Sequence, residues 1–243
     1  MILTYLKMNL KAMTEFRLNF VMTNVSMLIG NALLLGAILY MAHISEGFGV
    51  LTFAEFIFSF AVGNIAYFFA INFFSGITKM QRTIISGELD KLLIRPISPY
   101  KHILMHRINP YGLAEIITAI IFLILVPINQ WPLLLFFSII SAIILHFSVL
   151  ALNTIPFYID LNSETHLWDL MITFMFYPTY MTNAFGKFIS FFLIPGALVT
   201  FGPVFALKYT WFAIFYGCFT VAIVILGLTL FHKGLQKYKS AGQ

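Results

Sequence analysis

Long apolar stretches separated by short polar connections are the main pattern of this chain. Six stretches come close to the ~20 residues that a helix needs to cross the hydrocarbon core of a bilayer. They cover residues 23–42, 53–75, 110–126, 133–155, 167–182 and 211–231. A crossing segment must satisfy its own backbone hydrogen bonds, so each is expected to be helical. We therefore predict an all-α integral membrane protein with six transmembrane helices and a single domain, residues 1–243.

Residues 1–20 have a different pattern, which is typical of a helix lying on the membrane surface. Leu3, Leu6 and Leu10 share one face, while Lys7 and Lys11 lie on another. This separation favours an interfacial amphipathic helix. A plain extension of the first span is the alternative. Charged residues also interrupt the stretch where the apolar part of a cleaved signal peptide would lie, so none is predicted.

An irregular apolar segment lies between the fifth and sixth spans. Residues 188–201 are apolar but are shorter than a comfortable span. Pro195 and Gly196 interrupt the segment in the middle, and Gly202 and Pro203 are expected to close it. We predict a broken re-entrant hairpin over residues 188–207, packed against other helices because irregular backbone at membrane depth needs protein around it.

The second span has a recognisable start and one face of small residues. Thr52 followed by Glu55 is the pattern of a capping box, in which each side chain bonds the other residue's backbone N–H. Ser59, Gly63 and Tyr67 follow at spacings of four, and the small side chains of Ser59 and Gly63 allow helices to approach closely in a membrane.

Composition and charge agree with the spans and give them a direction. Of 243 residues, 60% are hydrophobic and only 9% are charged, too few charges for an ordinary soluble surface. With the N-terminus inside, twelve of the fourteen lysines and arginines are cytoplasmic, and only Lys187 and Lys208 are outside. This positive-inside bias predicts cytoplasmic N- and C-termini in a plasma membrane. The net charge of +5 then reflects topology, and no nucleic-acid partner is predicted.

The only long cytoplasmic connection, residues 76–108, contains six of the fourteen basic residues. Residues 78–86 can continue the second span as a helix, and Gly87 would end it. The next residues form a short amphipathic turn whose apolar side is Leu89, Leu92 and Leu93. Pro96 and a second proline stiffen the chain after this turn. The pattern favours a short rigid helix below the membrane, and a solvated loop is the alternative.

The block Gly87-Glu-Leu-Asp-Lys-Leu-Leu-Ile-Arg-Pro-Ile-Ser-Pro99 resembles the signature of a bacterial ABC-2 family of transporter permeases. The likeness extends over most of the chain. It implies a six-span permease that pairs with a second, identical or paralogous permease and is driven by a cytoplasmic ABC ATPase dimer. It also implies a coupling helix that contacts the ATPase, here carried by Glu88, Leu89, Asp90, Arg95 and Pro96. Such permeases export drugs, antibiotics, lipids or other amphiphiles.

Two further groups of residues are expected to serve this function. The short cytoplasmic loop 158–166 contains Asp160 and Glu164 and no lysine or arginine, so it could make a secondary contact with a basic ATPase surface. The resemblance implies that spans 1, 2 and 5 line the translocation path. Aromatic and amide side chains on spans 2 and 5 suit apolar or amphipathic cargo; these are Phe60, Asn64, Phe68, Phe174, Tyr177 and Tyr180.

No pattern for catalysis occurs in the chain. There is no Gly-x-x-x-x-Gly-Lys-Ser/Thr motif for ATP and no Gly-x-Ser-x-Gly motif. His102 and His106 are spaced for a metal but lack further ligands, and interfacial histidines are favoured over a metal site. We therefore expect no cofactor and no enzyme activity in this chain, with ATP and magnesium bound by the partner ATPase. An ion-coupled secondary transporter and a membrane-embedded enzyme remain the alternatives.

Overall fold

The computed structural model describes residues 17–44, 49–94, 96, 98–105, 112–161, 163–177 and 182–238. Helices make up the elements of this part of the chain, and no β-strand occurs in it. The predicted interfacial helix lies outside the described residues except for residues 17–20, which belong to the first long helix.

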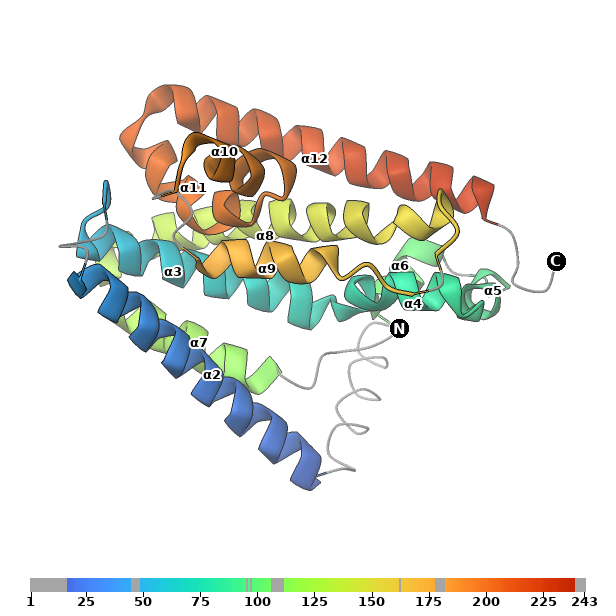
Figure 1. Cartoon of the computed structure of the whole chain (residues 1–243), viewed down its shortest axis with the longest axis horizontal. Helices are drawn as coiled ribbons and strands as arrows, with labels where there is room; N and C mark the ends of the chain where they lie inside the picture. Colours follow the sequence, from blue (N-terminus) through green and yellow to red (C-terminus); the bar gives the residue numbers. More distant parts are fainter. Residues whose placement is uncertain are drawn as a thin grey trace.

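The helices follow the expected order (Figure 1). In chain order they are α2 (Arg17–Ile44), α3 (Phe53–Tyr67), η1 (Phe68–Phe73), η2 (Ser75–Lys79), α4 (Met80–Ile85), α5 (Glu88–Leu93), α6 (Pro99–Met105), α7 (Gly112–Leu125), η3 (Ile128–Gln130), α8 (Trp131–Asn153), η4 (Ile155–Phe157), α9 (Leu167–Phe176), α10 (Ala184–Phe188), η6 (Ile189–Leu193), α11 (Gly196–Lys208) and α12 (Thr210–Lys237). The elements η1 and η6 are π-helical, and η2, η3 and η4 are 3-10 helices.

Four described segments are long and apolar enough to cross a membrane: Arg17–Ala37, Phe53–Asn72, Ile128–Phe157 and Thr210–Lys237. The segments 184–193 and 196–208 would add a fifth span if they are counted as one, but they meet at a bend of 98°. Predicted spans 3 and 5 correspond to α7 and α9, which are apolar but shorter. Residues 106–111 and 178–181, next to these two helices, lie outside the described part of the chain. The all-helical membrane fold is therefore confirmed, and the count of six stays a prediction.

The start of α3 confirms the capping box. The Glu55 backbone N–H donates to Thr52 Oγ1 at 3.3 Å, and the Thr52 N–H donates to Glu55 Oε2 at 2.7 Å. Further along, Gly63 lies so close to α11 that an added Cβ would come within 2.6 Å of Thr200 Oγ1. The small residue thus allows α3 and α11 to pack closely, as the sequence pattern predicts.

Helix α11 corrects the prediction that Gly202 and Pro203 close the apolar hairpin. The helix continues through both residues to Lys208, with Pro203 inside it. A proline at 203 leaves the carbonyl of Val199, four residues earlier, without its usual donor. Ser141 of α8 supplies one, because its hydroxyl donates to Val199 O at 2.7 Å. The contact between distant helices therefore compensates for a residue that would otherwise end the helix.

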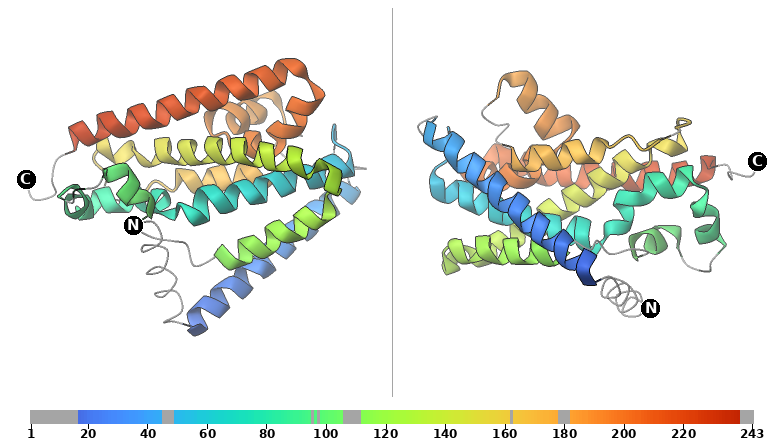
Figure 2. Two further views of the ribbon diagram at one scale, coloured as in Figure 1. Left: turned by 180° about the vertical axis from the view of Figure 1, so that it is seen from behind. Right: turned by 60° about the horizontal axis from the view of Figure 1, so that its bottom comes forward.

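The longer helices form a bundle from which one pair leans away. Helices α3, α8, α9 and α12 run alongside one another, whereas α2 and α7 lie side by side and diverge from them (Figures 1 and 2). Polar contacts join the pair: Asn24 Oδ1 accepts from the Ala114 N–H at 2.9 Å, and Asn31 donates to Thr118 Oγ1 at 3.0 Å. The buried core lies between α3, α8, α11 and α12.

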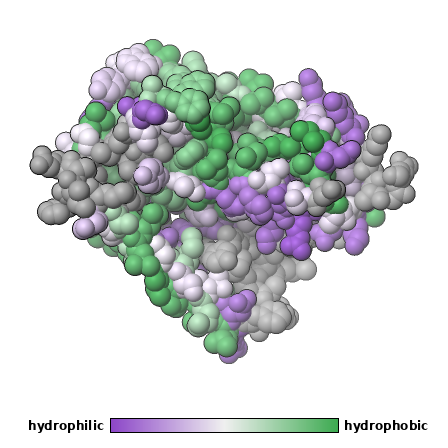
Figure 3. All heavy atoms as spheres, viewed as in Figure 1, coloured by the Kyte–Doolittle hydropathy of each residue, from purple (hydrophilic) through white to green (hydrophobic). Residues whose placement is uncertain are grey.

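Hydrophilic residues gather at the end of the bundle that holds α4 and α5, while apolar residues cover the middle (Figure 3). We call this end the α5 end. Helix α3 runs toward it through η1 and η2, and α12 finishes there at Lys237. Helices α10 and α11 lie at the opposite end.

Candidate functional site

The α5 end is built on a sharp change of direction at Gly87. This residue has φ 71°, a left-handed conformation that glycine adopts without a steric penalty. Helix α4 stops just before it, and α5 starts just after it. The predicted helix end at Gly87 and the short helix after it are therefore both confirmed.

The orientation of α5 corrects the prediction that its leucines form an apolar surface for a partner. Leu89 and Leu92 are 0% and 4% exposed because they pack into the chain's own core. They are therefore unavailable as an apolar surface for a partner. Leu93, at 40% exposed, and Ile94, at 84%, are the apolar residues that face outward. The periodicity of α5 correctly indicates an apolar face, but that face anchors the helix to its own protein.

The other residues of this predicted site lie around the anchored leucines. Glu88 and Pro96 are exposed, and Asp90 is half-buried. Arg95 lies outside the described residues. The surface that α5 presents outward consists of Glu88, Lys91, Leu93 and Ile94, which we call the outward surface of α5. It combines two charges of opposite sign with two apolar side chains.

Helix α6 lies against η2 at one very close approach. A Cβ built on Gly76 would overlap the carbonyl oxygen of Ile103. Only glycine fits at this position without a shift of the backbone. Because α6 follows α5 directly, this contact fixes the exit of the segment that holds α5.

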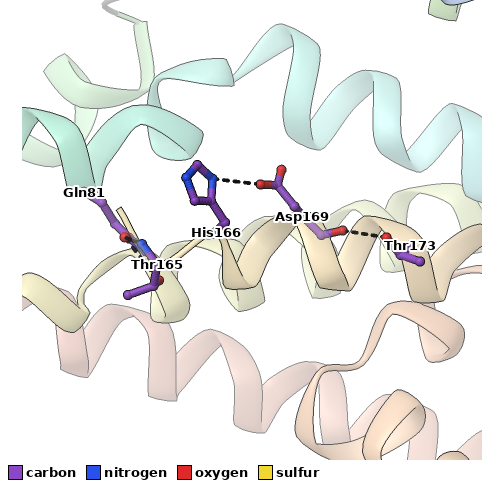
Figure 4. A network of polar contacts seen from close by, with 5 residues as sticks. All are labelled: Gln81, Thr165, His166, Asp169 and Thr173. Atoms are coloured by element: carbon purple, nitrogen blue, oxygen red, sulfur yellow. Dashed lines mark hydrogen bonds and ion pairs between the residues drawn. The ribbon is translucent and has the colours of Figure 1, made fainter. Parts of the chain in front are cut away.

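A glutamine joins α4 to the connection between η4 and α9 (Figure 4). The Thr165 N–H donates to Gln81 Oε1 at 2.8 Å, and Gln81 Nε2 donates to Thr165 Oγ1 at 2.9 Å. Gln81 is 1% exposed, so both of its amide ends are satisfied inside the protein. The connection 76–108 and the loop 158–166, which the sequence predicts as separate contacts with an ATPase, are thus joined to each other.

The start of α9 continues the same network. His166 has φ 53°, and its Nδ1 lies 3.0 Å from Asp169 Oδ2. Thr173 Oγ1 donates to the Asp169 carbonyl at 3.1 Å (Figure 4). His166 and Asp169 are exposed, so this pair contributes little stability by itself.

The end of α12 reaches the same unit. The ring of Tyr238 packs against that of Phe157, with centroids 6.0 Å apart, and Lys237 lies 5.0 Å from the centre of the Tyr158 ring. Burial, together with the nearby carboxylate of Asp90 on α5, raises the pKa of Tyr238 to about 12. Tyr238 therefore keeps its proton at neutral pH beside α5.

A groove of about 800 Å³ opens between these elements. Its lining comes from the end of α4, the segment 156–161 and residues 236–238. Asp160 is exposed and lies in this lining, and Glu164 is half-buried nearby in sequence. Of the two predicted secondary contact residues, Asp160 thus borders a recess on the α5 end.

The residues predicted to line a path are not brought together on one open surface. Phe60 is 2% exposed and its ring contacts the rings of Phe56, Phe122, Phe176 and Phe201. Asn64 is buried too, and its side chain donates to the Phe60 carbonyl at 2.9 Å.

These two positions belong to the core of one chain, because α7, α9 and α11 cover that face of α3. Phe68 and Phe174 are half-buried, Tyr177 is exposed, and Tyr180 lies outside the described residues. Phe60 and Asn64, which were predicted to line the translocation path, are core residues in this structure.

The end opposite α5 is held by close packing and one ion pair. A Cβ on Gly196 would overlap the Met171 carbonyl, and one on Gly202 would come within 2.7 Å of the Tyr216 ring. Lys208 Nζ lies 2.8 Å from Glu55 Oε2. Pro195 precedes α11 at the bend. The two helical pieces predicted around Pro195 and Gly196 are confirmed; whether they re-enter the membrane stays a prediction.

Sequence analysis missed Gln81, Thr165 and Ser141. Each makes its key contact with a residue 58 or more positions away, so no local pattern marks it. A polar residue inside an otherwise apolar helix is the one available signal, and Ser141 has it. Among the described residues, no group of three or more His, Cys, Asp or Glu side chains could hold a metal ion.

Long apolar helices around a core, with polar residues gathered at one end, define a membrane protein that crosses the bilayer several times. A family model described as "ABC-2 family transporter protein" matches residues 25–242, and the chain therefore belongs to that family. It is a membrane transport component, as the resemblance indicates. Comparisons with curated proteins and with solved structures find no match.

Proposed function

We propose that this chain is the transmembrane subunit of an ATP-driven ABC-2 exporter. It would form the translocation path with a second permease, while two separate ABC ATPase subunits bind ATP and magnesium. The observation that carries the proposal is the α5 end. There a short helix is anchored by buried Leu89 and Leu92 and is connected, through α4 and Gln81, to a second loop. A rigid unit of this kind transmits the motion of a partner domain, whereas a flexible loop would absorb it.

The proposed ATPase contact uses the outward surface of α5. Burying Leu93 and Ile94 against a partner would stabilise the complex by about 1.5–3 kcal/mol for each fully buried side chain. Glu88 and Lys91 would fix the register through charge pairing, which favours specificity more than affinity. The groove beside Asp160 would receive a second segment of the same partner. The α5 end is then cytoplasmic, and α10 and α11 cap the path at the outer side of a bacterial plasma membrane.

The surface of α2 supports a path formed by two permeases. This helix is exposed along almost its whole length, and the described part of the chain covers it mainly with α7. A second permease would cover part of this surface and leave the rest to lipid. The cargo proposed for such an apolar interface is hydrophobic or amphipathic.

The experiment is co-purification of the ATPase with a Leu93→Asp, Ile94→Asp double variant in detergent. We expect loss of the ATPase while the permease stays folded, because both side chains are exposed in the free chain. Ser98→Asp is the charge control, since Ser98 is also exposed and close to α5 but is not apolar. Full ATPase retention with normal transport by the double variant would contradict the proposal. Transport without any ATPase would instead support an ion-coupled secondary transporter.

A further inference from the structure

An apolar cavity of about 550 Å³ lies between η1 and the residue that follows it, α6 and α8. Its volume falls within the range of about 300–1,000 Å³ that is typical of small-molecule sites. The lining is almost entirely apolar and rich in aromatic rings, among them Phe69, Phe74 and Phe147. Among the described residues, no acidic side chain, lysine or arginine is part of the lining.

The mouth of the cavity opens beside exposed apolar residues of two candidate spans. Phe69 is 49% exposed and Ile139 is 62% exposed, and both belong to candidate spans. Hydrocarbon is therefore the expected solvent at this mouth, and from it an acyl or alkyl chain can enter sideways without crossing water. The proposed ATPase surface and the groove beside Asp160 involve none of these residues.

One polar pair lies in the cavity wall. Tyr100 Oη and His146 Nε2 are 2.8 Å apart, and both side chains belong to the lining. Burial raises the pKa of Tyr100 to about 12, so its hydroxyl keeps its proton. If that proton is donated to His146, the phenol oxygen still has lone pairs that accept hydrogen bonds. A ligand group at this point should therefore be a hydrogen-bond donor.

The rings around the pair favour a particular kind of donor. Phe74 and Phe147 lie next to His146, with ring centroids 5.8 Å and 5.1 Å away, and Tyr100 lies edge-on to it at 6.2 Å. Aromatic faces attract a desolvated cation. An alkylammonium head combines this attraction with N–H donors, and its chain would fill the apolar remainder of the cavity.

We propose that the cavity between η1, α6 and α8 binds a single-chain amphiphile that enters from the bilayer, with its hydrogen-bond-donating head held at Tyr100 and His146. The site lies within one chain and does not depend on a second permease or an ATPase. Because Tyr100 is on α6, which follows α5 directly, the ligand touches the segment that leads out of the α5 end.

The test is photolabelling of the full-length chain in phosphatidylcholine vesicles with a long-chain alkylamine that carries a diazirine. A methyl ester of the same chain length, which has no donor, is the comparison probe. We expect the amine to label peptides from η1, α6 and α8. Ala142→Phe should fill the cavity, since Ala142 is part of the lining, and should lower labelling by about tenfold, equivalent to ~1.4 kcal/mol.

Two further variants keep the test decisive. Ala213→Phe, at an exposed position of α12 outside the lining, should leave labelling unchanged. Tyr100→Phe keeps the ring and removes the hydroxyl, so it should lower amine labelling by about fivefold without affecting the ester, as expected for ~1 kcal/mol. Labelling spread evenly over the lipid-facing helices, or unaffected by both Ala142→Phe and Tyr100→Phe, would overturn the proposal.

The source of the ligand can be separated in the same system after the ATPase is added. A transported amphiphile should leave the site when ATP is supplied, whereas a resident lipid should remain. A failure of the amine to label the site in vesicles without ATPase would refute the binding site and leave the proposed export function untouched.

Discussion

Helices α2 and α3 have the same mean hydropathy and opposite surroundings. The candidate spans Arg17–Ala37 and Phe53–Asn72 both have a mean hydropathy of 1.6. In the 18-residue apolar stretch of each span, however, 78% of the residues are buried inside the protein for α3 and only 6% for α2. Hydropathy thus reports that a segment prefers a membrane to water. It does not report whether protein or lipid covers the segment, because both are apolar.

The difference lies in how each helix contacts its neighbours. Helix α3 packs against α7, α8 and α11, and Gly63 lets one of these contacts become very close. Helix α2 is joined to α7 by polar side chains, Asn24 and Asn31. We infer that α3 is part of the stable core of one subunit, and that α2 keeps a surface available for another molecule.

The largest expected effect is that of Gly63→Val on α3 compared with Gly30→Val on α2. A Cβ at Gly63 would meet fully buried Thr200, and overpacking of this kind costs about 1–3 kcal/mol. At Gly30 nothing lies within 4 Å, so the same substitution should change stability by less than about 0.5 kcal/mol. Thermal unfolding of both variants in detergent measures the difference. Equal losses would refute the contrast between the two helices.

A comparable loss is expected for Ser141→Ala, which tests the core from a second side. Ser141 donates to the Val199 carbonyl and lies 2.7 Å from the Tyr216 hydroxyl. Its removal leaves a buried carbonyl unsatisfied beside Pro203, which costs about 1–3 kcal/mol. Ser138→Ala is the control, because within the described part of the chain Ser138 bonds only the Leu134 carbonyl of its own helix. Unfolding midpoints that drop equally for both would show that the contact between α8 and α11 is unimportant.

The smallest effect is expected between α2 and α7. Asn31→Leu removes the hydrogen bond to Thr118 and the one to Glu115 of α7, and such bonds in membranes contribute only about 0.6 kcal/mol each on average. We expect little change in the unfolding midpoint but faster deuterium exchange in α2 and α7, measured by mass spectrometry. Loss of the whole fold in this variant would mean that α2 belongs to the core.

Sequence patterns predicted the features that depend on neighbouring residues. The capping box at Thr52 and the helix end at Gly87 follow from local backbone chemistry, and the long spans follow from hydropathy. Distant residues decide whether an apolar face is buried in its own protein or left for a partner. This is why Leu89 and Leu92 were wrongly predicted to face an ATPase. The same limit applies to Phe60, whose aromatic character suits a path lining and a core equally well.

Tertiary contacts also determine whether a helix-breaking residue ends its helix. Pro203 has the local chemistry of a helix end, yet Ser141, 62 positions earlier in the chain, supplies the missing donor for Val199. Gln81 has no local pattern at all, although it joins the two loops of the α5 end. Such contacts become visible only when the helices are placed in space.

We propose that this chain works as one of two permeases coupled to two ATPases through the α5 end. Native mass spectrometry of the complex, expressed with its ATPase and solubilised in mild detergent, tests it most directly. The account predicts one assembly with two permease and two ATPase subunits, which loses the ATPase in the Leu93→Asp, Ile94→Asp variant. A single copy of this chain that transports substrate with no ATPase bound would contradict it.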